Sequence, residues 1–152
     1  MNALPTQELL IRPIQPEDAG QVAILAEQLG YQRSATDIKA WIEALPPRSD
    51  HQAAFVACIA DEIVGWIEIS VQRHLQSAPH ALIGGLVVKE GYRNRQIGLR
   101  LCEHVEQWTW LRGLPILRVT SRSTRLDAHR FYERNGYQFT KLSHVYEKHR
   151  PE

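Results

Sequence analysis

The residues best suited to chemistry lie where a strand pattern gives way to a helix pattern. Residues 81–88 are apolar, as expected of a buried strand, and apolar residues recur at helical spacing from about Arg95 to Leu111. Arg93, Arg95 and Arg100 lie at this junction. The first turn of a helix has unpaired backbone N–H groups and carries the positive end of the helix dipole. With the added arginine charges, the junction predicts a binding site for a phosphate group.

The same junction matches a family motif. Leu86, Val87 and Val88 end the strand pattern, and residues 93–98 read Arg-Asn-Arg-Gln-Ile-Gly. This arrangement resembles the acyl-CoA-binding motif of the GCN5-related N-acetyltransferase (GNAT) superfamily, in which Leu-x-Val and a short spacer precede Arg/Gln-x-x-Gly-x-Gly/Ala. Gln96 stands where the family usually has its first glycine. Taken alone, the junction also fits an ordinary strand–helix unit with a solvated basic turn.

A second stretch, further along the chain, strengthens the resemblance. Residues 128–137 read Ala-His-Arg-Phe-Tyr-Glu-Arg-Asn-Gly-Tyr, similar to the family's Ala-x-x-Phe-Tyr-x-x-x-Gly-Phe/Tyr. The resemblance implies that acetyl-CoA is the cosubstrate. It also implies that backbone N–H groups at the strand end hold the thioester carbonyl and pantetheine, and that those of the turn hold the pyrophosphate. The CoA-binding residues expected on this basis are Leu86, Val87, Val88, Arg93, Asn94, Arg95, Gln96, Ile97 and Gly98.

Transfer of an acetyl group from a thioester to an amine needs a neutral amine, donors for the developing oxyanion and a proton for the departing thiolate. The resemblance implies that Tyr132 gives the proton to the CoA sulfur; the alternative is a core aromatic packed beside Phe131. No motif supplies the general base. Glu68 is our candidate for it, and a surface carboxylate or a structural ion pair is the alternative. His74 and His80, in the adjoining loop, have a suitable ordinary pKa, although a solvated loop histidine is the plainer interpretation.

The order of strand and helix patterns is β-α-α-β-β-β-α-β-α-β-β, which predicts an α/β fold with a mixed, mostly antiparallel sheet of about seven strands. The strand after the long helix is expected to lie parallel to the strand at 81–88. This order is similar to the GNAT fold over the whole chain, and that resemblance implies that these two strands splay apart and leave a gap for pantetheine. The strand patterns cover residues 8–14, 52–60, 63–71, 81–88, 116–120, 137–140 and 142–147.

Composition narrows the class of protein. The 152 residues are 43% hydrophobic and 23% charged, which is typical of a single globular domain, here spanning residues 1–152. The 18 basic and 17 acidic residues nearly balance, so neither nucleic acid nor a membrane surface is expected as a partner. Cys58 and Cys102 form no disulfide framework, and the start of the chain lacks a signal-peptide pattern, so we expect a cytoplasmic protein. The histidines lack paired ligand spacing, so no metal is expected.

These features together predict an acetyl-CoA-dependent N-acetyltransferase. Direct transfer in a ternary complex would acetylate a primary amine of a small molecule or, as second choice, of a protein. The alternative is a non-catalytic acyl-CoA-binding module of the same fold. Acceptor specificity is expected from Tyr31 and Arg33, from the loop at 72–80 and from the last two strands. Homodimers are common in the family that the chain resembles, but the oligomeric state stays open.

Overall fold

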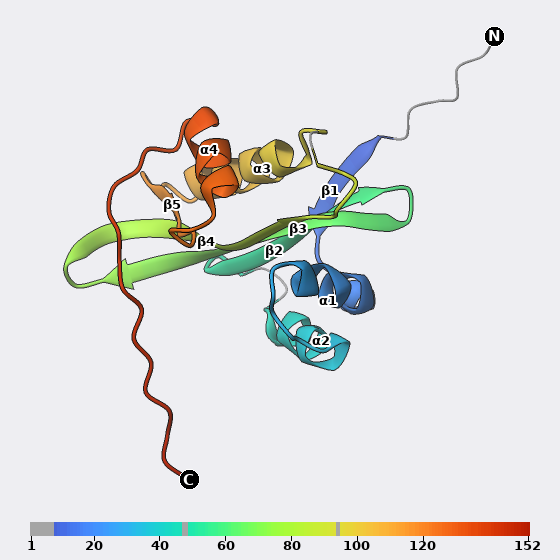
Figure 1. Cartoon of the computed structure of the whole chain (residues 1–152), viewed down its shortest axis with the longest axis horizontal. Coiled ribbons are helices and arrows are strands. Elements are labelled where there is room, and N and C mark those ends of the chain that lie inside the picture. The colour runs from blue at the N-terminus through green and yellow to red at the C-terminus, as the bar shows by residue number, and fades with distance from the viewer. Residues whose placement is uncertain (1–7, 47–48, 94) are drawn as a thin grey trace. The chain divides into compact units, whose positions relative to one another are not determined.

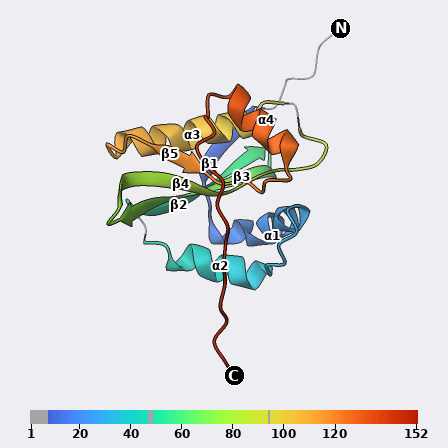
Figure 2. The ribbon, with the colours of Figure 1, turned by 60° about the vertical axis from the view of Figure 1, so that its left-hand side comes forward.

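The computed structural model of the chain describes residues 8–46, 49–93 and 95–152. Within these residues, five strands form one sheet in the order β1-β2-β3-β4-β5. Helices α1 and α2 lie on one face of this sheet and α3 lies on the other (Figures 1 and 2). The α/β fold class predicted from the sequence is confirmed. The elements are β1 (Leu9–Pro13), a 3-10 helix η1 (Pro16–Asp18), α1 (Ala19–Gln28), α2 (Ala35–Ala44), β2 (Gln52–Ile59), β3 (Glu62–His74), β4 (Ser77–Val88), α3 (Ile97–Leu111), β5 (Leu117–Val119) and α4 (Leu126–Arg134).

The direction of the strands changes at β4. Strands β1 to β4 are antiparallel to their neighbours, whereas β5 is parallel to β4, as predicted for a strand that follows a helical crossover. Pairing between β4 and β5 covers residues Ala81 to Ile83 of β4. Beyond Ile83, β4 continues to Val88 with no strand on its β5 side among the described residues. This part of β4 therefore offers an open edge.

Apolar layers on both faces of the sheet fix the position of its strands. On one face, Val22 and Leu25 of α1 pack with Val56 and Val87 in a buried cluster. On the other, α3 covers the sheet, and the ring of His104 lies 4.4 Å from that of Phe55, centroid to centroid. Truncating one such fully buried aliphatic side chain to alanine costs about 2–5 kcal/mol. The strands that carry the site are thus held rigidly.

The segment at 72–80, expected to be a loop, instead extends the hairpin of β3 and β4. Gln72 pairs with His80 and His74 pairs with Ser77, so the turn itself is confined to Leu75 and Gln76. The prediction of a loop at residues 72–80 is therefore wrong. Neither turn residue is a glycine, an asparagine or a proline, so the usual sequence signal of a tight hairpin is missing.

The described chain divides into two compact units, residues 1–120 and 121–152. The second unit contains α4, and Gly136 follows its end: Gly136 has a φ of +92°, and its N–H donates to the carbonyl oxygen of Glu133 at 3.2 Å. A glycine suits this position because other side chains rarely adopt a left-handed backbone. Among the helices of the described ranges, none has both the length and the apolar character needed to cross a membrane.

The two strands predicted at 137–140 and 142–147 are not formed, so the sheet has five strands rather than about seven. Only Lys141 separates the two predicted strands, and a lysine does not favour a reversing turn. The apolar residues also change parity there, so they define no single strand face. They are largely exposed: Phe139 at 70%, Leu142 at 75%, Val145 at 86% and Tyr146 at 89%.

Candidate active site

The turn after β4 is fastened to the neighbouring elements at several points. The Gln28 side chain of α1 donates to the carbonyl oxygen of Val88 and accepts from the N–H of Glu90, both at 3.0 Å. Glu62, at the start of β3, pairs with the ammonium of Lys89 and accepts from the Tyr92 hydroxyl at 2.9 Å. The hydrogen bonds from Lys89 and Tyr92 lower the pKa of the Glu62 carboxyl. Lys89 is thus already paired with a carboxylate, and the arginines further along the turn are better placed to bind an anion.

Helix α3 starts without a cap of its own. The backbone of Gln96, the residue before the helix, is left-handed with a φ of +62°. Its side chain makes no capping hydrogen bond, and the first turn holds no acidic residue. The helix begins at Ile97, slightly later than the expected start near Arg95. Within the described residues, the N–H groups of this helix start thus receive no capping bond from Gln96, and they suit an anionic ligand.

Positive charge surrounds this helix start. Arg93, Arg95 and Arg100 are exposed, and no ion pair involves them within the described parts of the chain. The guanidinium of Arg95 lies 4.9 Å from the centroid of the Tyr92 ring. Asn94, the remaining member of the predicted turn, lies outside the described residues. The phosphate-binding prediction thus rests on three arginines and an uncapped helix.

A β-bulge in β4 places Glu68 against the backbone of the motif strand. Glu68 pairs with Gly85 and Ile69 pairs with Ile83, so Gly84 is an extra residue in the register. A Cβ atom added to Gly84 would lie 3.2 Å from the Oε2 atom of Glu68. That spacing is tighter than ordinary van der Waals contact. The missing side chain at Gly84 therefore makes room for the carboxylate beside the open edge of β4.

The surroundings of Glu68 favour its protonated form. Burial raises the pKa of its carboxyl, and a hydrogen bond from the Gln52 side chain opposes part of that shift. Among the described residues, no lysine, arginine or histidine nitrogen lies within 4.0 Å of this carboxylate. Glu68 is thus neither a solvated carboxylate nor a member of an ion pair in the described part of the chain. A half-buried carboxyl with a raised pKa is typical of general bases.

Trp66 forms the wall beside Glu68. Its six-membered ring lies against Gly85, where an added Cβ would be 2.8 Å from a ring carbon. Its indole N–H is buried and has no hydrogen-bond partner in the described structure. Trp66 also packs against the buried cluster around α1.

The two histidines considered as alternative bases lie together on the β3–β4 hairpin. Their rings stack with centroids 5.9 Å apart. His74 is exposed, whereas His80 is only 3% exposed. Its Nδ1 atom is 3.1 Å from the carbonyl oxygen of Ala78, and its Nε2 atom is 3.4 Å from a guanidinium nitrogen of Arg118 on β5. His80 is therefore held by neighbours on both ring nitrogens, an arrangement that suits a positioning role.

Tyr132 lies on α4, in the unit formed by residues 121–152. It is half-buried, and its ring makes edge-to-face contacts with Phe131 and Tyr137 at centroid distances of 5.2 and 5.6 Å. Both neighbours belong to the motif-like stretch at 128–137. The contact with Phe131 matches the packing role considered for Tyr132. Its role as proton donor stays a prediction.

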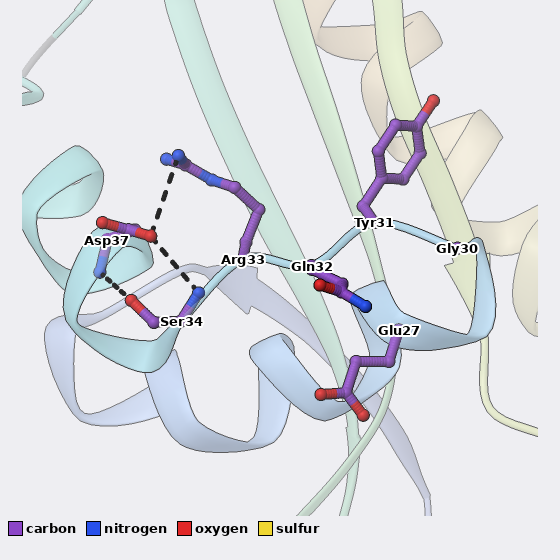
Figure 3. Close-up of a pocket in the computed structure, with 7 residues that line it drawn as sticks. All are labelled: Glu27, Gly30, Tyr31, Gln32, Arg33, Ser34 and Asp37. Carbon is purple, nitrogen blue, oxygen red and sulfur yellow. Dashed lines mark hydrogen bonds and ion pairs between the residues drawn. The ribbon is translucent and has the colours of Figure 1, made fainter.

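An open pocket of about 630 Å³ lies at the loop between α1 and α2 (Figure 3). Ser34 and Asp37 cap α2 reciprocally, with Asp37 N donating to Ser34 Oγ at 3.0 Å. Arg33 points toward Asp37, 4.0 Å away, whereas the phenol of Tyr31 points away from this pair. Both residues predicted to affect acceptor specificity thus line this pocket. Its full lining is Glu27, Gly30, Tyr31, Gln32, Arg33, Ser34 and Asp37.

Two contributors to the site could not be identified from the sequence: Gln52 and Arg118. Gln52 and Arg118 belong to strands that were predicted, but only the register shows that they share a face with Glu68. Alternation along β2 indicates that residues 52, 54 and 56 face the same way. Alternation alone does not say which residue of β3 lies opposite. In the described residues, no three His, Cys, Asp or Glu side chains gather to hold a metal ion.

Comparison with known proteins identifies the class to which this arrangement belongs. The family model described as Acetyltransferase (GNAT) family matches residues 21–137. This match covers most of the chain and includes both motif-like stretches, so the chain belongs to the GNAT acetyltransferase family.

Three individual proteins are similar to this chain. The aminoalkylphosphonate N-acetyltransferase of Salmonella typhimurium is 36% identical over 78 residues, which are 51% of this chain and 51% of that protein. The chain thus aligns with about half the length of this curated relative. The structure of AAC(6')-Iy with the bisubstrate analogue CoA-S-monomethyl-acetylneamine has a TM-score of 0.81 at 19% identity, and covers 93% of this chain and 99% of that one. The aminoglycoside 6'-N-acetyltransferase AAC(6')-Ih from Acinetobacter baumannii has a TM-score of 0.79 at 18% identity, with coverage of 93% and 99%.

Proposed function

We propose that this protein is an acetyl-CoA-dependent N-acetyltransferase that acts on a primary amine of a small molecule. The observation that carries the proposal is the open edge of β4, which has an uncapped, arginine-rich helix start at one end and Glu68 against its bulge. The named activities of the relatives support it, because they acetylate aminoalkylphosphonates or aminoglycosides, and both are small amines.

Two features of the chain support the binding of acetyl-CoA. The open edge of β4 at Leu86, Val87 and Val88 can pair with the pantetheine arm as an added strand. The N–H groups of Ile97 and Gly98, together with Arg93 and Arg95, would hold the pyrophosphate. Acetyl-CoA supplies the activated acyl group, and the protein supplies position and charge.

Glu68 acts as the general base in this proposal. The acceptor arrives as an ammonium ion, and it must lose a proton before its lone pair can attack the thioester carbonyl. Glu68 takes that proton, directly or through a water molecule. The new C–N bond forms as the C–S bond breaks, and Tyr132 donates its phenolic proton to the departing thiolate. The acylated nitrogen then loses its second proton to give the amide, and this proton, carried by solvent, restores the phenol of Tyr132. A carboxyl with a raised pKa is the stronger base once ionised, which suits this step.

One pair of measurements tests the proposal. CoA and acetyl-CoA binding is measured by the rise in melting temperature, and thiol release from acetyl-CoA is followed against a panel of amines, amino acids, polyamines, aminoglycosides and peptides. We expect binding together with turnover of at least one small amine, and loss of turnover in Glu68→Gln. Binding without turnover of any amine would favour a non-catalytic acyl-CoA-binding module.

A further inference from the structure

Several polar side chains lie on the face of the sheet that carries Glu68, with apolar Leu82 between those of β3 and β5. Residues directly opposite in paired strands share a face. The register therefore places Ser70 opposite both Gln52 and Leu82, places Gln72 opposite His80, and joins Leu82 to Arg118. The Gln72 side chain donates to Ser70 Oγ at 2.9 Å, so these two side chains contact each other. Acidic Glu68 and basic Arg118 lie on the same face, two strands apart.

Arg118 is a half-buried guanidinium without a carboxylate partner. In the described ranges of the chain, no acidic oxygen lies within 4.0 Å of it. Its partner is the Nε2 atom of His80, at 3.4 Å, and this contact uses one of the five N–H donors of a guanidinium. The other donors keep their capacity for an anion.

Buried His80 gives Arg118 a fixed direction. The Nδ1 atom of His80 lies 3.1 Å from the carbonyl oxygen of Ala78, so the neutral ring donates there and leaves its Nε2 lone pair to accept from Arg118. A neutral acceptor orients the guanidinium and leaves its charge uncompensated. A carboxylate in the place of His80 would instead have neutralised the charge of the guanidinium.

The distance between the two charged groups limits the size of a ligand that could contact both. The Glu68 carboxylate lies over Gly84, and the Arg118 guanidinium lies beside His80, so the two groups mark positions four residues apart on β4. One of these residues is the bulge, and at about 3.3 Å per remaining residue the separation is roughly 10 Å. A hydrogen bond of about 2.8 Å at each end leaves room for a short chain of a few atoms.

We propose that Arg118, oriented by His80, binds the anionic group of a zwitterionic acceptor whose primary amine faces Glu68. The acceptor class is thus a short ω-amino acid, either an aminoalkylphosphonate or an aminocarboxylate, and this assignment rests on the N-acetyltransferase function proposed above. The opposed charges of the site match the opposed charges of such a molecule. A polycationic amine would meet uncompensated repulsion from Arg118.

The test compares three short amines that differ mainly in the group opposite the amine, together with one polycation. We would measure kcat/KM for 2-aminoethylphosphonate, 3-aminopropanoate, n-propylamine and the polycation neamine, with wild type and with Arg118→Gln. We expect wild type to prefer the two zwitterions by roughly 10-fold or more, because a charge-assisted hydrogen bond is lost with n-propylamine. Arg118→Gln should remove this preference mainly through KM and should leave n-propylamine nearly unchanged. The phosphonate and carboxylate arms show which anion fits better.

Two further variants separate binding from folding. Arg118→Lys keeps the charge and should retain part of the preference, and Arg150→Gln, at an exposed arginine of the C-terminal segment, should leave every rate unchanged. Preference for n-propylamine or neamine in wild type would overturn the proposal, and so would an equal loss for all amines in Arg118→Gln.

The subsite can also be tested without turnover. If no amine is acetylated, the proposed function fails, but 2-aminoethylphosphonate should still raise the melting temperature of the CoA-bound wild type and not that of CoA-bound Arg118→Gln. The absence of this difference would overturn the anion subsite by itself.

Discussion

Glu68, the proposed general base, is half-buried, and this burial links its ionisation to stability. Burial raises the pKa of its carboxyl, so the folded protein holds the proton more tightly than the unfolded chain does. Its contribution to the free energy of unfolding is therefore largest at acid pH, and it falls as the pH rises from the unfolded to the folded pKa. Ionised Glu68 thus costs stability at neutral pH.

Glu68→Gln should accordingly be at least as stable as wild type at pH 7 while losing activity. Wild-type kcat/KM should rise with pH through the raised pKa of Glu68, because the base must be ionised. The variant should lack this rise, with kcat/KM lower by roughly 10²- to 10⁴-fold. The melting temperatures of both proteins check the predicted stability, and their pH profiles of kcat/KM check the predicted loss of activity. An unchanged profile and rate would assign the proton to His74, His80 or solvent.

Tyr132→Phe removes a single oxygen, so it separates catalysis from packing. Its ring contacts with Phe131 and Tyr137 should persist, and the melting temperature and CoA affinity should change little. A phenol is protonated at neutral pH and can donate to a departing thiolate, so we expect kcat to fall by roughly 10²-fold. Near-wild-type kcat with a lowered melting temperature would instead identify Tyr132 as a packing residue.

Gln96 has the left-handed backbone that explains why the family usually has glycine there. A non-glycine residue in this conformation costs roughly 1–2 kcal/mol. Gln96→Gly relieves that cost, although the more flexible unfolded chain offsets part of it. We expect an unchanged or slightly higher melting temperature and CoA affinity within about threefold of wild type. A tenfold loss of CoA affinity would show that the glutamine side chain contacts the ligand.

At the scale of elements, the bulge of β4 is the feature that brings the motif strand against Glu68, the proposed base. An alanine at Gly84 would place its Cβ 3.2 Å from the Glu68 carboxylate, whereas a Cβ at Gly20, on α1, would meet no atom within 4 Å. Gly84→Ala should therefore displace Glu68 and lower kcat/KM by about tenfold or more, since small shifts of catalytic groups have large effects. Gly20→Ala, the matched control, should keep full activity and gain up to about 1 kcal/mol from helix propensity.

Activity in Gly84→Ala equal to wild type would show that the carboxylate tolerates the shift or plays no part. A comparable loss in Gly20→Ala would point to general disruption of the fold. The two substitutions add the same methyl group, so the contrast between them isolates the position.

The sequence predicted elements well and relations between elements poorly. Apolar periodicity located β2, β3 and α3 because each has a long pattern of one kind. The β3–β4 hairpin was underestimated because its turn, Leu75-Gln76, lacks the residues that usually mark one. The subsite residue Arg118 escaped notice because only strand register places it on the face of Glu68.

The same contrast holds for the candidate site. The basic turn was recognisable because its helix start and arginines are contiguous in sequence. Glu68 was a candidate by its position on a strand, but the space that Gly84 leaves for it follows from a bulge. The adjacent glycines Gly84 and Gly85 favour a bulge or a close backbone approach in a strand, but only the pairing of the strands places Glu68 beside it.

At the scale of the whole molecule, ligand binding should be visible as a change in global stability. A ligand that binds the folded state alone adds about 2.7 kcal/mol to the free energy of unfolding at 100 times its dissociation constant. We therefore expect CoA and acetyl-CoA to raise the melting temperature in a concentration-dependent way. The increase should shrink in a double variant, Arg93→Gln with Arg95→Gln, because the pyrophosphate then loses its charged partners beside α3.

The control for this measurement is Arg150→Gln, which removes the charge of an exposed arginine far along the chain from the turn. It should show the full CoA-dependent increase, and added salt should weaken the increase in wild type more than in the double variant, since screening acts on the arginine contribution. No increase for wild type at millimolar CoA would contradict the assignment of the β4–α3 turn as the CoA site. An equal increase in wild type and the double variant would leave the backbone N–H groups of α3 as the anion-binding groups and remove the two arginines from the site.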